Sequence, residues 1–128
     1  MKEIAKEWIQ KAEEDYRVAV RELKAKPPAL NSVCFHTQQC IEKYLKAVLQ
    51  ENNISFQKIH DLDILVELLK GILPELEKFR ENLVKLNVYA VEVRYPGFNP
   101  LEKDAREAVS IMKKVRSFIR KFLQEGTK

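Results

Sequence analysis

The chain of 128 residues has few of the residues that build tight turns and cross-links. It contains three glycines. Strand-rich folds need many tight turns with positive φ angles, which glycine supplies, so this scarcity favours helices joined by short loops. The two cysteines, Cys34 and Cys40, would lie about 9 Å apart along the axis of one helix, which is too far for a disulfide between them.

Long apolar segments are absent as well. No run approaches the roughly 20 apolar residues that cross a bilayer, and the charged first segment does not resemble a secretion signal. We therefore expect a cytoplasmic protein without a membrane segment.

Histidine is scarce, and this limits the chemistry. His36 and His60 are the two histidines, and neither has a second histidine or cysteine at a metal-binding spacing. There is no glycine-rich phosphate loop, and Cys34 points away from His36 on a helix because the two are only two residues apart. We expect no metal site and no cofactor.

The composition is that of a single globular domain over residues 1–128. Hydrophobic residues make up 45% of the chain, and 23 Lys and Arg face 19 Asp and Glu, for a net charge of +4. This excess would assist contact with phosphate, but it is too small to identify a dedicated nucleic-acid-binding protein.

Apolar residues recur at three- and four-residue steps in several segments, which indicates amphipathic helices. The pattern predicts an all-α fold, an antiparallel up-and-down bundle of four long helices plus one short helix. The β-branched run 88–93 has no partner strand and is assigned to a helix end. The expected helices cover residues 2–24, 31–52, a short one from 61, 74–93 and 99–126.

Capping residues predict where these helices begin. Asn31 or Ser32 would cap the second helix, and Asp61 the short third helix. Asn99 would cap the last helix, with Pro100 in its first position and Glu102 as the reciprocal partner.

Polar residues on the second helix form a strip on an otherwise apolar segment. Two interpretations remain open: a ligand-binding surface, or an ordinary solvent-exposed face. Phe35 lies within the polar arc, where an aromatic ring is expected to be exposed or to meet another chain. The strip contains His36, Gln39, Glu42, Lys43, Lys46 and Gln50.

Arg94 precedes a rigid turn, Pro96-Gly97, and the last helix. A guanidinium beside a helix start makes a plausible anion site. The alternative is structural, because Arg94 could equally pair with Glu92 or Asp61, or cap the preceding helix.

Taken together, these segments resemble the HEPN domain, in its branch of short stand-alone prokaryotic members. The resemblance covers nearly the whole chain. It rests on Trp8 and Asp15, on FHTQQCIEKYLKA from Phe35 to Ala47, on His60-Asp61-Leu62, and on Tyr89 followed by Arg94-Tyr95-Pro96-Gly97.

The resemblance implies a helical bundle that commonly forms a homodimer and that associates with a minimal nucleotidyltransferase, often as a toxin–antitoxin pair. Family members bind nucleotides or RNA, and many are metal-independent endoribonucleases. Those nucleases use an arginine followed, after four to six residues, by a histidine. Here Arg94 matches the arginine, but Asn99, Pro100 and Leu101 fill the possible histidine positions. Asparagine cannot act as a general base near neutral pH.

The sequence therefore favours a non-catalytic HEPN module that binds a nucleotide, RNA or the nucleotidyltransferase. Arg94 would hold phosphate, and Tyr95 or Tyr89 would stack on a base. Two alternatives remain: an endoribonuclease toxin whose site recruits His36 or His60, and a purely structural dimerising module. The expected ligand-binding residues are Arg94, Tyr95, His60, Asp61, Gln39, Lys43 and Tyr89.

Overall fold

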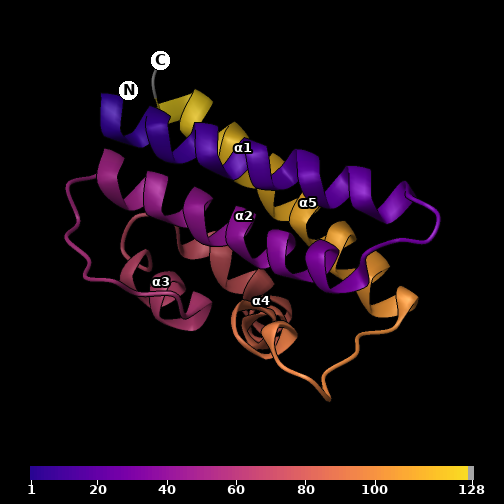
Figure 1. Cartoon of the computed structure of the whole chain (residues 1–128). Coiled ribbons are helices and arrows are strands. Elements are labelled where there is room, and N and C mark those ends of the chain that lie inside the picture. The colour runs from indigo at the N-terminus through magenta and orange to yellow at the C-terminus, as the bar shows by residue number, and fades with distance from the viewer. Residues whose placement is uncertain (127–128) are drawn as a thin grey trace.

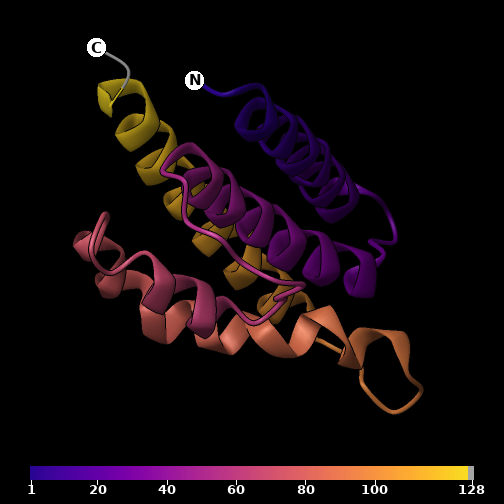
Figure 2. The ribbon, with the colours of Figure 1, turned by 90° about the vertical axis from the view of Figure 1, so that its left-hand side faces the viewer.

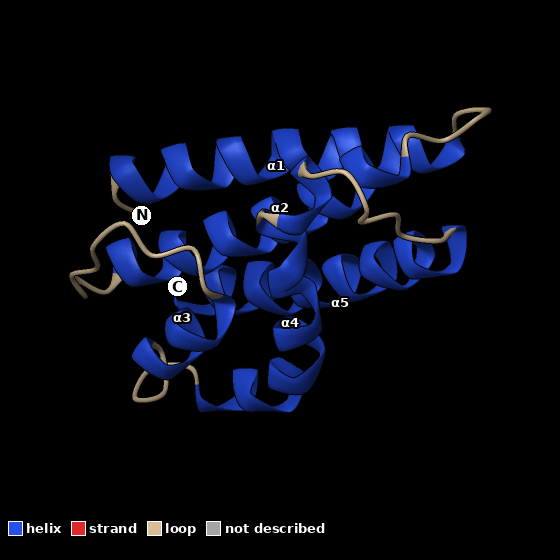
Figure 3. Cartoon of the chain, turned by 60° about the horizontal axis from the view of Figure 1, so that its bottom comes forward, coloured by secondary structure: helices blue, strands red, loops and turns tan. Residues whose placement is uncertain are grey.

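The computed structural model describes residues 1–126, which form helices and loops without a strand (Figure 3). Helices α1 (Glu3–Lys24) and α2 (Leu30–Glu51) are antiparallel neighbours (Figure 1). On α1, Ala5, Ala12 and Ala19 are fully buried. These small residues, seven apart, allow α2 to approach α1 closely. The end of α1 at Lys24, just before the Pro27-Pro28 pair, confirms the prediction.

Helix α2 is the central element, and thirteen of its 22 residues are buried. It packs against α1, against α5, and against the segment that contains α3 and α4 (Figure 2). The predicted caps Asn31 and Ser32 are wrong, because α2 begins at Leu30 after Ala29, without a side-chain cap. The N–H of Val33 already bonds the carbonyl of Ala29, at 3.0 Å, so the first turn closes before either polar side chain could cap it.

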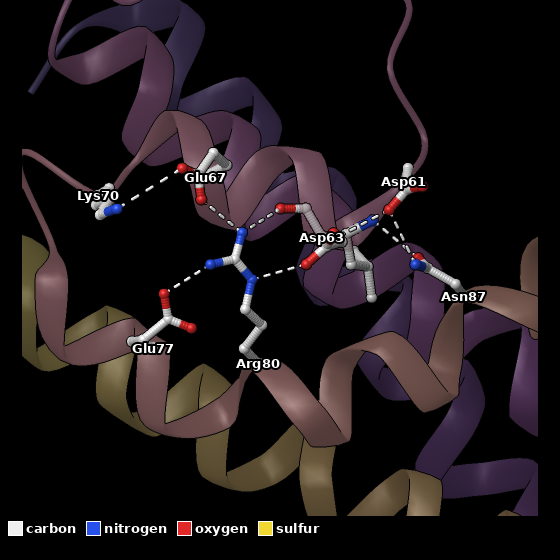
Figure 4. A network of polar contacts seen from close by, with 8 residues as sticks. Asp61, Asp63, Glu67, Lys70, Glu77, Arg80 and Asn87 are labelled. Atoms are coloured by element: carbon white, nitrogen blue, oxygen red, sulfur yellow. Dashed lines mark hydrogen bonds and ion pairs between the residues drawn. The ribbon is translucent and has the colours of Figure 1, made fainter.

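Helix α3 (Leu62–Leu68) begins at its predicted cap, since an Asp61 carboxylate oxygen accepts from the N–H of Asp63 at 2.8 Å. Arg80, the first residue of α4 (Arg80–Leu86), fixes α3 to α4. Its guanidinium donates to Asp63 and Glu67, both at 2.7 Å, and to Glu77 at 2.6 Å (Figure 4).

The fourth predicted helix is a series of short turns between Pro74 and Arg94. It crosses α2 and α5 steeply instead of running beside them (Figures 1 and 3). Two features explain the interruptions. The β-branched valines lose side-chain rotamer freedom in a helix, which lowers their helix propensity. The Asn87 side chain bonds Asp61 and the N–H of Leu62. The turns are η1 (Pro74–Phe79), α4, η2 (Asn87–Ala90) and η3 (Glu92–Arg94). The all-helical bundle is thus confirmed, and its fourth segment departs from a regular up-and-down helix.

The periodicity predicts a buried stripe on the last helix from Leu101 to Phe122. Helix α5 (Glu102–Gly126) buries its members Ala105, Ala108, Met112, Val115 and Ile119, and Phe122 is half-buried, but Leu101 precedes the helix and is 57% exposed. Its predicted start is wrong. Leu101 directly precedes the helix, and its N–H donates to the Asp104 carboxylate at 2.8 Å. Asn99 and Pro100 lie outside the helix, and Glu102 pairs with Arg106 instead of closing a capping box. Because the Leu101 carbonyl accepts the first helical hydrogen bonds, from the N–H groups of Asp104 and Ala105, Leu101 occupies the N-cap position and Asn99 has no capping role.

No helix within residues 1–126 is both long enough and apolar enough to cross a membrane.

Candidate functional site

Phe35, on the second turn of α2, places an arginine and a histidine on one surface. The Arg94 guanidinium, at the end of η3, lies 5.1 Å from the centre of the Phe35 ring. The His36 ring meets Phe35 edge-on, with the centroids 5.3 Å apart. All three side chains line a shallow hollow of about 290 Å³, together with Asn31, Ser32 and Val93. We call this surface the Arg94–His36 hollow.

Arg94 is exposed and makes no ion pair with any of residues 1–126. The predicted structural alternative, pairing with Glu92 or Asp61, is therefore not what the structure shows. A guanidinium stacked on a ring keeps its planar set of donors available to an anion. Three residues after Arg94 the chain turns at Gly97, which adopts a left-handed conformation (φ 95°) that favours glycine.

His36 is oriented by its own helix and by α1. Its Nδ1 lies 2.8 Å from the carbonyl oxygen of Ser32, four residues earlier, and therefore carries the proton of the neutral ring. Nε2 lies 3.8 Å from a carboxylate oxygen of Asp15. The neutral imidazole thus has its free lone pair on Nε2.

Asp15 links His36 to Lys43. It is 8% exposed, and Lys43 Nζ donates to its carboxylate at 2.6 Å. Burial raises the pKa of Asp15, while Lys43 and His36 act in the opposite direction. Lys43, a predicted ligand residue, is therefore already engaged by a buried carboxylate.

A second polar group lies further along α2, around the nearly buried Glu42. Its carboxylate contacts Gln38 Nε2 at 3.2 Å, Lys46 Nζ at 2.9 Å and His60 Nδ1 at 3.1 Å. Gln38 also donates to the His60 carbonyl at 3.0 Å and accepts from Gln39 at 2.7 Å. Glu42 and Lys46 are 2% and 4% exposed, so this part of the polar strip is not a solvated face.

The tyrosines and Asp61 occupy different surroundings. Tyr89 is half-buried and has a pKa raised by burial. Its ring lies 6.1 Å from that of Phe98. Tyr95, next to Arg94 in sequence, is 59% exposed. Asp61 caps α3 and accepts from Asn87 at 2.9 Å.

The structure therefore brings only part of the predicted ligand site together. Arg94 and His36 share one hollow, and Asp15 connects Lys43 to His36. His60 and Gln39 belong to the Glu42 group, and Asp61 serves a helix cap. These residues, which were expected to line a single cleft, therefore lie at two separate places along α2.

Sequence reasoning missed Phe35 as the platform that joins Arg94 to His36, and Asp15 as the link to Lys43. An aromatic residue directly before a histidine on a polar arc is the only local signal for the first. Within residues 1–126, no group of three or more histidine, cysteine or acidic side chains could hold a metal ion.

Comparisons with known proteins agree with this architecture. The HEPN domain model matches residues 5–122. A protein of Methanocaldococcus jannaschii named "Putative toxin" is 33% identical over an alignment of 146 positions, covering 94% of this chain and 89% of that protein. The crystal structure of an archaeal HEPN homologue has a TM-score of 0.69 at 23% identity, and the match covers 94% of this chain and 97% of the other. The chain belongs to the HEPN domain family.

Proposed function

We propose that this protein is a HEPN module that binds the phosphate groups of RNA or a nucleotide at the Arg94–His36 hollow, without cleaving them. The observation that carries the proposal is the exposed, unpaired guanidinium of Arg94, held over the Phe35 ring beside His36. Charge-assisted hydrogen bonds from a guanidinium suit phosphate oxygens. The exposed ring of Tyr95 supplies a surface on which a base can stack.

Asn99, which is separated from Arg94 by four residues, supports binding over catalysis. Asn99 is exposed and lies outside α5. Its amide neither takes up nor releases a proton near neutral pH, so it cannot activate a 2′-hydroxyl.

A second candidate, an endoribonuclease, is favoured by one observation. His36 lies in the same hollow as Arg94, and its Nδ1 bond to Ser32 leaves Nε2, 3.8 Å from Asp15, as the proton-accepting nitrogen of the neutral ring. A histidine from α2 would then replace the missing one. His60 is a poorer candidate because it belongs to the Glu42 group. The toxin name of the Methanocaldococcus relative supports this candidate, because ribonuclease action is one route to toxicity.

Apolar side chains around Arg94 support a protein partner at the same place. Val91, Tyr95 and Leu101 are 52%, 59% and 57% exposed. Exposed apolar groups gathered in one segment are typical of interaction surfaces. We propose that a second copy of the chain covers them, as a homodimer, or that a minimal nucleotidyltransferase does, in the cytoplasm. Light scattering of the purified chain tests directly whether it forms a homodimer.

The experiment follows binding and integrity of a short RNA in the same samples. The parent is compared with Arg94→Ala and with a control, Arg106→Ala, which removes an exposed arginine that pairs with Glu102 on α5. We expect intact RNA, binding by the parent and the control, and about tenfold weaker binding by Arg94→Ala. Cleavage that is lost in both Arg94→Ala and His36→Gln would establish the nuclease instead. No binding by the parent would refute the proposal and leave the structural module.

A further inference from the structure

A second hollow, larger than the first, lies near the other end of α2. It has a volume of about 470 Å³ and is formed by α1, α2 and the connection that precedes α3. We call it the Trp8–Lys58 hollow. Lys46 is ten residues beyond His36 on α2, so the two hollows are separated by about 15 Å along the helix axis. Its lining residues are Trp8, Lys46, Phe56, Gln57, Lys58 and His60.

Two aromatic rings form its apolar surface. Trp8 of α1 and Phe56 of the connection lie with their centroids 6.2 Å apart and their planes at 59°. Lys46 Nζ lies 5.3 Å from the Trp8 ring centre and 5.7 Å from that of Phe56. The indole N–H of Trp8 is buried and has no acceptor among residues 1–126. Packing against Phe56 and the Lys46 ammonium therefore fixes the indole, instead of a hydrogen bond.

A lysine and a histidine border these rings. Lys58 is exposed and makes no ion pair within residues 1–126, and the His60 side chain is 67% exposed. His60 Nδ1 faces Glu42, at 3.1 Å, so its Nε2 edge is turned away from that carboxylate. Glu42 is nearly buried and already has three nitrogen partners. Glu42 therefore does not compete with a ligand for Lys58.

From these contacts we infer a second ligand site, which takes a planar base that carries a phosphate group. The base packs against Trp8 and Phe56, stacked on one ring and edge-on to the other, because the two ring planes are 59° apart. The Lys58 ammonium holds the phosphate, and His60 Nε2–H joins it when the imidazole carries both protons, with Nδ1–H on Glu42. The same chemistry is found in a free mononucleotide and in the 5′ end of an RNA strand. This site is independent of the Arg94–His36 hollow.

Trp8 makes the test direct, because it is the single tryptophan of the chain. Its fluorescence is followed while AMP, adenosine, inorganic phosphate or a 5′-phosphorylated tetranucleotide is added. We expect saturable quenching by AMP or by the tetranucleotide, and much weaker effects of adenosine and phosphate alone. A lower Kd for AMP identifies a free nucleotide as the ligand, and a lower Kd for the tetranucleotide identifies a strand end.

Variants assign the signal to the hollow. Lys58→Gln and His60→Gln alter exposed side chains and should each raise Kd about tenfold. Lys103→Gln, an exposed lysine on α5, and Arg94→Ala should leave Kd unchanged. Failure of the Arg94 proposal therefore does not affect this readout. The inference is overturned if neither ligand gives saturable quenching, or if quenching persists unchanged in both Lys58→Gln and His60→Gln.

Discussion

The pairing of Glu13 with Arg116 predicts a specific loss of stability in acid. Arg116 on α5 donates to both carboxylate oxygens of Glu13 on α1, at 2.6 and 2.7 Å. The Tyr44 hydroxyl of α2 donates to the same carboxylate, and Arg120 lies 3.8 Å from it. The hydrogen bond from Arg116 is the main reason that the pKa of Glu13 falls from 4.5 to about 2.

This pKa difference sets the magnitude. At about 1.4 kcal/mol per pH unit, a fall from 4.5 to about 2 corresponds to about 3 kcal/mol. The Glu13 side chain is 21% exposed, and solvent screening reduces the figure to about 1.5–2 kcal/mol. Because the folded-state pKa is depressed, this stabilisation is fully present above pH 4.5 and is lost as the pH falls towards 2.

The assay is urea unfolding of the parent and of Glu13→Gln between pH 2 and 7. The difference in unfolding free energy should be largest above pH 5 and should shrink steadily below pH 4.5. Other carboxyls, such as Asp15 with its raised pKa, titrate in both proteins and cancel in the difference. Glu7→Gln, which alters an exposed glutamate on the same helix, is the control and should give no such trend. Parallel stability curves for the parent and Glu13→Gln across this range would refute the reasoning.

Three further predictions follow from buried or capping groups. Burial raises the pKa of Cys34 to about 11, so its thiol should react with a thiol reagent at pH 8 only after unfolding; rapid labelling of the native protein would contradict this. Asp104→Ala should cost about 1 kcal/mol in urea unfolding, and Asn99→Ala should be near neutral, since the Asp104 carboxylate holds the N–H of Leu101 at the start of α5; a larger loss for Asn99→Ala would show that Asn99 caps the helix. Lys43→Met should cost about 2 kcal/mol by removing the ammonium that donates to the buried Asp15 carboxylate, and adding Asp15→Asn should recover most of that loss, measured as a double-mutant cycle.

Local signals predicted the fold well where one segment determines its own structure. The Asp61 cap is an example, because the acceptor and the N–H that it serves are two residues apart. The start of α5 shows the limit: Asn99-Pro100 is a good local signal, but burial of Pro100 and the Asp104 side chain place the first turn later. The short turns of residues 74–94 likewise depend on the contact of Asn87 with Asp61, far away in sequence.

The candidate site was predicted less completely, for the same physical reason. The sequence singled out Arg94 and His36 separately, but their meeting over Phe35 depends on how η3 packs against α2. Glu42 and Lys46 have the spacing of a solvent-exposed face. They are buried because Lys46 packs under Phe56 and Trp8, from segments whose positions no helical periodicity reveals.

The central claim is that Arg94 holds phosphate, and the salt dependence of RNA affinity tests it most directly. The affinity of a short single-stranded RNA is measured over a series of salt concentrations for the parent, Arg94→Ala and Arg106→Ala. If Arg94 contacts one phosphate, its removal should weaken binding about tenfold at low salt. It should also make the slope of log affinity against log salt shallower by about 0.7, with Arg106→Ala matching the parent. An Arg94→Ala protein with the affinity and slope of the parent would contradict the account.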